Sequence, residues 1–248
     1  MTDGSLGHQA VVDAAPDVLY ELIADPAMAP RLFPTVLHLE RTEGSDTDHV
    51  LQRWVIAGDS IRTWRARRTL DRDGRRIVFE HDSPRPPVRW MRGEWTFGHA
   101  PGGGCVVELR HDFRLGDDGG RFAEDLDRNV GAQLAELKRI GESLPRLAAA
   151  TVSVRDHTLI RRPVDEVFAV LVQLDRWPGV DQVHRLPLPG NRLVFKQGEP
   201  LVVGSWWVAA TADGAEVALE QTVVAGRDRE QLAADVSAAL DHLVSLTS

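Results

Sequence analysis

Residues 11–25 read VVDAAPDVLYELIAD, and residues 159–175 read LIRRPVDEVFAVLVQLD. Each stretch predicts a short strand, a proline near the start of a helix, and an amphipathic helix. The apolar positions that share a helix face are Val18, Leu19, Leu22 and Ile23 in the first stretch and Val167, Phe168, Leu171 and Val172 in the second. Two separate segments of the chain therefore begin with the same order of predicted elements.

The similarity continues toward the end of each segment. Residues 76–79, RIVF, match residues 192–195, RLVF, and Trp95 is echoed by Trp206 or Trp207. Each segment then ends in an alternating strand, 106–113 or 217–224, followed by a helix at about 122–144 or 228–246. Such a repeat predicts two related domains, 1–148 and 152–248, joined near residues 145–155.

The two segments differ in length. From Pro30 to Arg76 the first has 46 residues, whereas from Pro178 to Arg192 the second has 14. The first segment fills this distance with alternating strands at 49–57 and 60–70, linked by a turn at Gly58-Asp59. We therefore expect the second domain to lack two to three strands, including any counterpart of Trp64 and Arg68.

The pattern of elements is strand, helix, antiparallel strands and a long final helix. An antiparallel sheet with one apolar face needs a cover, which a long amphipathic helix supplies. The expected fold class is therefore α+β, with a curved antiparallel sheet around a long helix and a cavity between them.

Composition narrows the function classes. The net charge of −8 argues against nucleic acid as a partner, and no apolar run is long enough to cross a membrane. Cys105 is the only cysteine, so no disulfide framework is possible. The first ten residues lack a basic start and an apolar stretch, so we expect no secretory signal and a cytoplasmic protein.

Seven arginines lie between Arg62 and Arg76. This stretch is either a solvated strand face or a docking patch for an acidic partner such as an acyl carrier protein.

Motifs of common enzymes are missing. The sequence has no GxSxG, HExxH, GxxxxGK[ST] or GxGxxG, and its nine histidines have no metal-ligand spacing. We therefore expect no metal and no cofactor.

Alternation places polar groups on apolar faces. In 60–70, Trp64, Ala66 and Leu70 make the even face the interior, which also places Arg68 inside. A buried guanidinium needs partners, so Arg68 either pairs with a carboxylate such as Glu80 or Asp82 or binds a ligand oxygen.

Two further strands and the final helix of the first domain give more candidates. Met91, Trp95 and Phe97 share one face, and His111 lies on the apolar face of 105–113. His111 is either a proton shuttle or a hydrogen-bonded core residue. Asn129 and Gln133 adjoin the apolar stripe of the helix, so either is placed to reach the cavity.

The stretches LQRWVIAGDSIRTWRARRTLD, RRIVFEHD and PPVRWMRGEWTF, between Val50 and Phe97, resemble the polyketide aromatase/cyclases of the helix-grip (START-like) superfamily, in particular those with two domains. Trp64, Arg68 and Trp95 match family features, and Ala66 stands where a single-domain relative has a hydroxyl. The resemblance implies a helix-grip fold for both domains.

The resemblance also implies a reaction. A poly-β-ketone on an acyl carrier protein would be bent in the cavity, closed by aldol condensation between carbons 7 and 12, and dehydrated, after reduction at carbon 9. Arg68 would stabilise an oxyanion, and His111 or a water would move protons. The candidate substrate-binding residues are Trp54, Trp64, Ala66, Met91, Trp95, Phe97, Asn129 and Gln133.

The implied partners are the acyl carrier protein and other polyketide synthase components, with a homodimer left open. Two alternatives remain: a non-catalytic carrier of hydrophobic ligands, and a synthase-associated folding chaperone. Whether the shortened second domain binds substrate, braces the first domain or forms contacts with partners also stays open.

Overall fold

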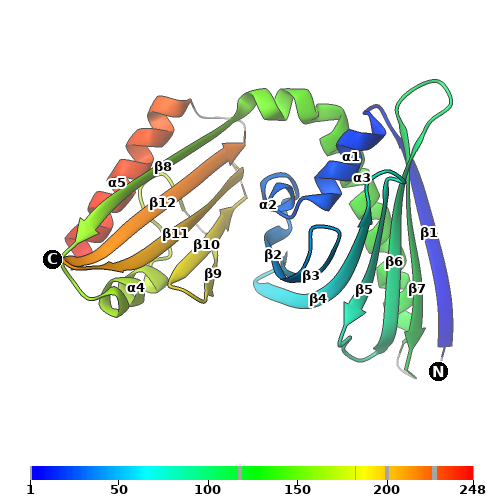
Figure 1. Ribbon diagram of the computed structural model, residues 1–248, viewed down its shortest axis with the longest axis horizontal. Helices are drawn as coiled ribbons and strands as arrows, with labels where there is room; N and C mark the ends of the chain where they lie inside the picture. The colour runs from blue at the N-terminus through cyan, green and yellow to red at the C-terminus, as the bar shows by residue number, and fades with distance from the viewer. Residues whose placement is uncertain (1, 117–118, 182, 199–200, 225–227, 248) are drawn as a thin grey trace. The chain divides into compact units, whose positions relative to one another are not determined.

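The computed structural model describes residues 2–116, 119–181, 183–198, 201–224 and 228–247. The chain divides into two compact units, Met1–Pro145 and Arg146–Ser248, and each contains one antiparallel sheet (Figure 1). The predicted α+β fold class is therefore confirmed. The domain limits 1–148 and 152–248 stay a prediction, since the division between the units falls within a helix.

The first unit holds a seven-stranded sheet. Its elements are β1 (Thr2–Val12), α1 (Pro16–Ala24), α2 (Met28–Leu32), β2 (Val36–Gly44), β3 (Asp48–Ala57), β4 (Ser60–Asp71), β5 (Arg76–Asp82), β6 (Val88–His99), β7 (Cys105–Leu115) and α3 (Gly120–Ala150). The strand order is β1-β7-β6-β5-β4-β3-β2, so that only β1 is out of sequence order. The predicted hairpin of β3 and β4 is present, with Ala57 paired to Ser60.

One face of this sheet carries the core. On β7 the odd positions from Cys105 to Leu115 are all buried, and the register places Trp95 and Gly93 of β6 on the same face. The first part of α3 covers one region of this inner face. There Phe122 and Leu126 pack against a buried cluster, whose members are Val88, Met91, Phe113 and Leu115.

Helix α1 packs on the same side of the sheet. The ring of Tyr20 meets the edge of Phe97, with 6.0 Å between ring centroids. Leu19 is fully buried and lies beside Gly141 of α3. Val18 is exposed, so its predicted place on the apolar face is wrong, because the face that packs is centred on Leu19 and Leu22.

The second unit repeats this plan with fewer strands. Its elements are β8 (Thr151–Ile160), α4 (Val164–Gln173), β9 (His184–Leu188), β10 (Arg192–Gln197), β11 (Leu201–Thr211), β12 (Gly214–Val224) and α5 (Arg229–Thr247). The sheet order is β8-β12-β11-β10-β9. Among the described residues this sheet has two strands fewer than the first, within the predicted loss. No separate linker joins the repeats, because α3 runs to Ala150 and β8 starts at Thr151.

The strand registers align the two repeats residue by residue. In the first sheet Phe79 pairs with Gly93, which pairs with His111. In the second sheet Phe195 pairs with Gly204, which pairs with Gln221. The phenylalanine ring lies over the glycine in both sheets, where a Cβ atom would overlap the ring. The same alignment makes Trp206, not Trp207, the counterpart of Trp95, because Leu193 pairs with Trp206 as Ile77 pairs with Trp95.

Strand β9 occupies the sheet position of β4. Phe195 pairs with Arg185, as Phe79 pairs with Arg68. The prediction that the second repeat has no counterpart of Arg68 is therefore wrong. The sequence HRLPL does not stand out as a strand, because it is short and contains Pro187. Proline is tolerated in β9 because this strand lies at the edge of the sheet.

We expect Gly93→Ala to lower the free energy of unfolding of the first unit by about 1–3 kcal/mol, because the added methyl group would displace the Phe79 ring. Urea denaturation measures this change. Gly98→Ala on the same strand is the matched control, because a Cβ there meets only the Val106 carbonyl oxygen at 4.0 Å. Equal losses in the two variants would contradict the close packing of Phe79 on Gly93.

Candidate active site

A row of polar and aromatic side chains crosses the inner face of the first sheet. The Arg53 guanidinium lies over Trp64, with Cζ 5.3 Å from the ring centroid. Trp64 stacks on His81 with 6.3 Å between centroids, and His81 lies 6.4 Å from Phe79. Phe79 in turn meets His111 at 5.5 Å. Four strands, β3, β4, β5 and β7, thus contribute to one continuous row, which we call the inner row.

Burial separates the inner row from the packed core. Arg53, Trp64, Phe79 and His81 face inward yet are only half-buried. The predicted substrate-binding residues Met91, Trp95 and Phe97 are instead 5 %, 4 % and 3 % exposed. Met91 belongs to the cluster beneath α3, and Trp95 stacks on Phe97 at 6.1 Å. These three side chains pack the core. The inner row stays partly accessible from Arg53 to Phe79, and His111 at its far end is 6 % exposed.

The two histidines of the inner row are neutral near pH 7. Burial lowers the pKa of His81 to about 4, with a further contribution from Arg53. Burial also lowers the pKa of His111 to about 4, with a contribution from His81. Nδ1 of His111 is buried and has no hydrogen-bond partner among the described residues. A neutral imidazole of this kind can accept a proton from a bound ligand or donate a hydrogen bond to it.

Arg68 is buried on the inner face, as expected from the alternation. Its Nη2 donates to the carbonyl oxygen of Ile23 at 2.7 Å, and its Nη1 lies 3.4 Å from the carbonyl oxygen of Ala24. These two carbonyl groups lie at the C-terminal end of α1, where the last carbonyls of a helix have no N–H partner within the helix. The suggested pairing of Arg68 with Glu80 or Asp82 is wrong, because both carboxylates lie on the exposed face of β5.

Burial, and then the charge of Arg53, lower the pKa of Arg68 to about 10, so that it remains a cation.

Other predicted residues lie away from the inner row. Trp54 pairs with Thr63 on the opposite face of the sheet and stacks against His38, so it cannot line the same surface as Trp64. On α3, Asn129 is exposed and Gln133 is half-buried. Ala66 is buried between Trp64 and Arg68 on β4, where its small side chain leaves room for the longer ones.

The arginine-rich stretch 62–76 is largely neutralised within the first unit. Arg72 pairs with Glu21 and Arg75 with Asp17, each at 2.5 Å. The other pairs are Arg65 with Glu43 and Asp82, Arg67 with Asp48, and Arg76 with Glu94. The stretch is therefore not an uncompensated patch of positive charge, although such exposed pairs contribute little to stability.

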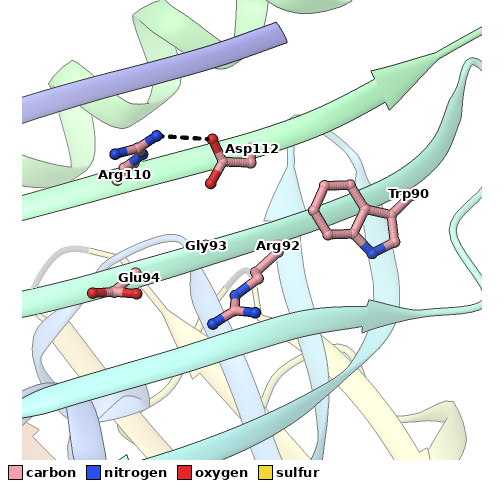
Figure 2. Close-up of a pocket in the computed structure, with 6 residues that line it drawn as sticks. All are labelled: Trp90, Arg92, Gly93, Glu94, Arg110 and Asp112. Atoms are coloured by element: carbon pink, nitrogen blue, oxygen red, sulfur yellow. Dashed lines mark hydrogen bonds and ion pairs between the residues drawn. The ribbon is translucent and has the colours of Figure 1, made fainter. Parts of the chain in front are cut away.

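A groove of about 380 Å³ lies on the outer face of the same sheet. Its lining residues are Trp90, Arg92, Gly93, Glu94, Arg110 and Asp112 (Figure 2). Figure 2 shows Arg110 directed at Asp112, a pair at 3.4 Å. The odd positions of β7 point inward and these even positions point outward, so the groove is separate from the inner row.

Other chemistry finds little support in the part of the chain that is described. Cys105 is buried, and burial raises the pKa of its thiol to about 11, so it is no thiolate nucleophile. No three His, Cys, Asp or Glu side chains gather there as metal ligands. None of the described helices has the length and hydropathy needed to cross a membrane.

Sequence reasoning missed three residues of the inner row, Arg53, Phe79 and His81. The predicted hairpin contained the signal for Arg53. Across the turn at Gly58-Asp59, Arg53 pairs with Trp64 and His49 with Arg68, so odd positions of β3 share the inner face with even positions of β4. Phe79 and His81 follow from the next register, opposite Arg68 and Ala66.

Comparison with known proteins gives the family. A model described as "Polyketide cyclase / dehydrase and lipid transport" matches residues 12–135, half of the chain. The chain belongs to this family. The matched region contains every residue of the inner row.

Two curated relatives carry the same description. The chain is 29 % identical over 174 residues to a granaticin polyketide synthase bifunctional cyclase/dehydratase of Streptomyces violaceoruber, covering 68 % of this chain and 54 % of that protein. It is 32 % identical over 161 residues to the actinorhodin counterpart of Streptomyces coelicolor, covering 64 % and 50 %. The chain thus spans about half the length of these relatives.

A solved structure matches along the whole chain. The di-domain ARO/CYC BexL from the BE-7585A biosynthetic pathway is 26 % identical, with a TM-score of 0.78 and coverage of 100 % of this chain and 99 % of that one. The likeness confirms the predicted fold, with its two related parts.

We expect Arg68→Met to lower the free energy of unfolding of the first unit by about 1–3 kcal/mol, because two carbonyls at the end of α1 lose their donor. Urea denaturation checks this, with Arg67→Met as the control on the exposed face of the same strand. The control should lose less than about 1 kcal/mol. An unchanged midpoint for Arg68→Met would show that α1 does not need this arginine.

The histidines predict a pH dependence of stability. Their folded pKa values of about 4 lie below the ordinary value of 6.5, so between these limits the unfolded chain binds protons that the folded chain excludes. Stability should therefore fall as the pH falls from 6.5 toward 4. Unfolding midpoints at several pH values should show a shallower fall for His111→Gln than for wild type. His99→Gln, which replaces an exposed histidine, is the control. Identical slopes in all three proteins would refute the buried neutral state of His111.

Proposed function

We propose that this chain is an aromatase/cyclase of type II aromatic polyketide biosynthesis. It closes and dehydrates the first ring of a poly-β-ketone at the inner row of the first unit. The observation that carries the proposal is the inner row itself, in which the guanidinium of Arg53 lies beside half-buried Trp64, and neutral, buried His111 meets half-buried Phe79 on the same face of the sheet. The family and the relatives named as cyclase/dehydratases support the reaction class.

The chemistry needs orientation and proton transfer. In the aldol step an enolate carbon forms a bond to a distant ketone carbon, and the resulting alkoxide takes up a proton. In the dehydration an α-proton and a β-hydroxyl leave together as water. Aromatic side chains that confine the chain supply effective concentration, and the apolar surroundings strengthen each polar contact.

Each residue then has a role. His111, neutral at pH 7, takes the α-proton and, as the imidazolium so formed, passes that proton to the leaving hydroxyl. Arg68 holds the end of α1 against the sheet and so acts by positioning. Trp64 and Phe79 are half-buried and give the growing ring apolar surface to pack against.

The finer features follow the same proposal. The substrate is a chain reduced at carbon 9, the ring closes between carbons 7 and 12, and an acyl carrier protein in the cytoplasm delivers the chain. The second unit holds no substrate, since Phe195, its counterpart of half-buried Phe79, is 1 % exposed within a filled core.

The test is reconstitution. A minimal polyketide synthase with its ketoreductase is run without added protein, with wild type, and with His111→Gln. Glutamine suits this position because Gln221 occupies it in the second sheet. Wild type should replace mis-cyclised shunt products by a compound with an aromatic first ring, and His111→Gln should reduce that compound by about 100-fold, a common size for loss of an acid–base group.

Other outcomes would count against the proposal. A wild-type product profile equal to that without added protein would refute the cyclase function for this substrate. Recovery of the poly-β-ketone bound but unchanged would indicate a carrier. Full activity in His111→Gln, with wild-type melting temperature, would remove His111 from the mechanism.

A further inference from the structure

The inner face of the first sheet carries two guanidinium groups with different surroundings. Arg53 comes from β3 and Arg68 from β4, and after burial the charge of Arg53 also lowers the pKa of Arg68. Arg68 directs two of its N–H groups at the backbone of α1. Arg53 makes no hydrogen bond and no ion pair through its side chain with any described residue.

The second repeat shows what Arg68 does for the fold. Its counterpart Arg185 directs Nη1 at the carbonyl oxygens of Val172, at 3.1 Å, and Leu174. These carbonyls lie at the C-terminal end of α4, as those of Ile23 and Ala24 do for α1. The arginine thus ties helix to sheet in both repeats, including the one that has no counterpart of β3 and whose β9 is too short to reach the position of Trp64. This contact is a requirement of the fold, independent of any inner row.

Arg53 makes no comparable contact with the end of a helix among the described residues. Its guanidinium lies over the Trp64 ring, and its Nε is buried without a hydrogen-bond partner. Burial lowers the pKa of Arg53 to about 10, so the group keeps its charge in surroundings that do not favour it. Of its neighbours on the inner face, His81 is neutral and Arg68 is a cation, so neither offsets the charge of Arg53. A half-buried cation whose Nε has no hydrogen-bond partner gains from any anionic oxygen that reaches it.

We propose that Arg53 is the guanidinium that binds an enolate oxygen of the substrate, and that Arg68 acts as a positioning residue through α1. This inference rests on the proposed function and adds a specificity to it. The ligand class is a 1,3-dicarbonyl in its enolate form, whose oxygens meet the N–H groups of Arg53 beside the Trp64 ring.

In this arrangement, anion binding and proton transfer take place at opposite ends of the inner row. Anion binding lies at the β3 side, at Arg53, and proton transfer lies at the β7 side, at His111. His81 and Phe79 separate the two functions. An extended chain can therefore be held by one enolate while a distant carbon of the same chain is deprotonated.

The test uses benzoylacetone, a small β-diketone whose enolate absorbs at longer wavelength than its neutral form. Its absorbance is titrated with pH in the presence of wild type, Arg53→Met, Arg53→Lys and Arg68→Lys, after melting temperatures have verified folding. Wild type should lower the apparent pKa of the diketone by about one unit, a tenfold shift. Arg53→Met should abolish the shift, Arg53→Lys should retain part of it, and folded Arg68→Lys should retain most of it.

Several results would overturn the inference. These are no shift with wild type, a full shift with Arg53→Met, or a shift lost in folded Arg68→Lys but kept in Arg53→Met. The reconstituted synthase gives the second readout, in which Arg53→Met should lower the first-ring aromatic product at least tenfold. A pKa shift that depends on Arg53, combined with no effect of wild type on polyketide products, would refute the proposed function and leave the enolate site intact.

Discussion

The hydrogen bond between a buried arginine and the end of a helix is the constraint on which both repeats depend. The C-terminal carbonyls of α1 and α4 have no donors within their helices, and the sheet supplies them through Arg68 and Arg185. Because the arginine stands opposite Phe79 or Phe195 in the register, the bond fixes where the helix meets the inner face. Once α1 is held there, Tyr20 meets Phe97 and the core closes beneath it.

The chemical properties of the inner row follow from the burial of its ionisable groups. Gly93 lets Phe79 lie close to the sheet, so that the ring bridges His81 and His111. Burial keeps both imidazoles neutral and leaves the charge of Arg53 without a matching carboxylate among the described residues. A neutral base and an unmatched cation on one aromatic surface suit a reaction that passes through enolates.

The two repeats share the residues that hold the fold together but differ in the residues of the inner row. The helix-anchoring arginine, the phenylalanine over glycine and the buried tryptophan occur in both. His111 is replaced by Gln221, and no strand of the second sheet corresponds to β3. The second core is filled, with Phe195 and Trp206 among its largest buried side chains. Loss of two strands therefore removed the inner row without removing the contacts that hold the repeat together.

The sequence by itself determined the α+β class, the repeat, the β3–β4 hairpin and the inward direction of Trp64, Arg68 and His111, because alternation and turn chemistry are local properties. It also contained Arg53, which pairs with Trp64 across the Gly58-Asp59 turn. Only the tertiary structure decided that Arg68 serves α1, that Met91, Trp95 and Phe97 are packed, and that Arg185 repeats Arg68. Those outcomes depend on which groups from distant elements meet each side chain, and a pattern of facing residues does not specify partners.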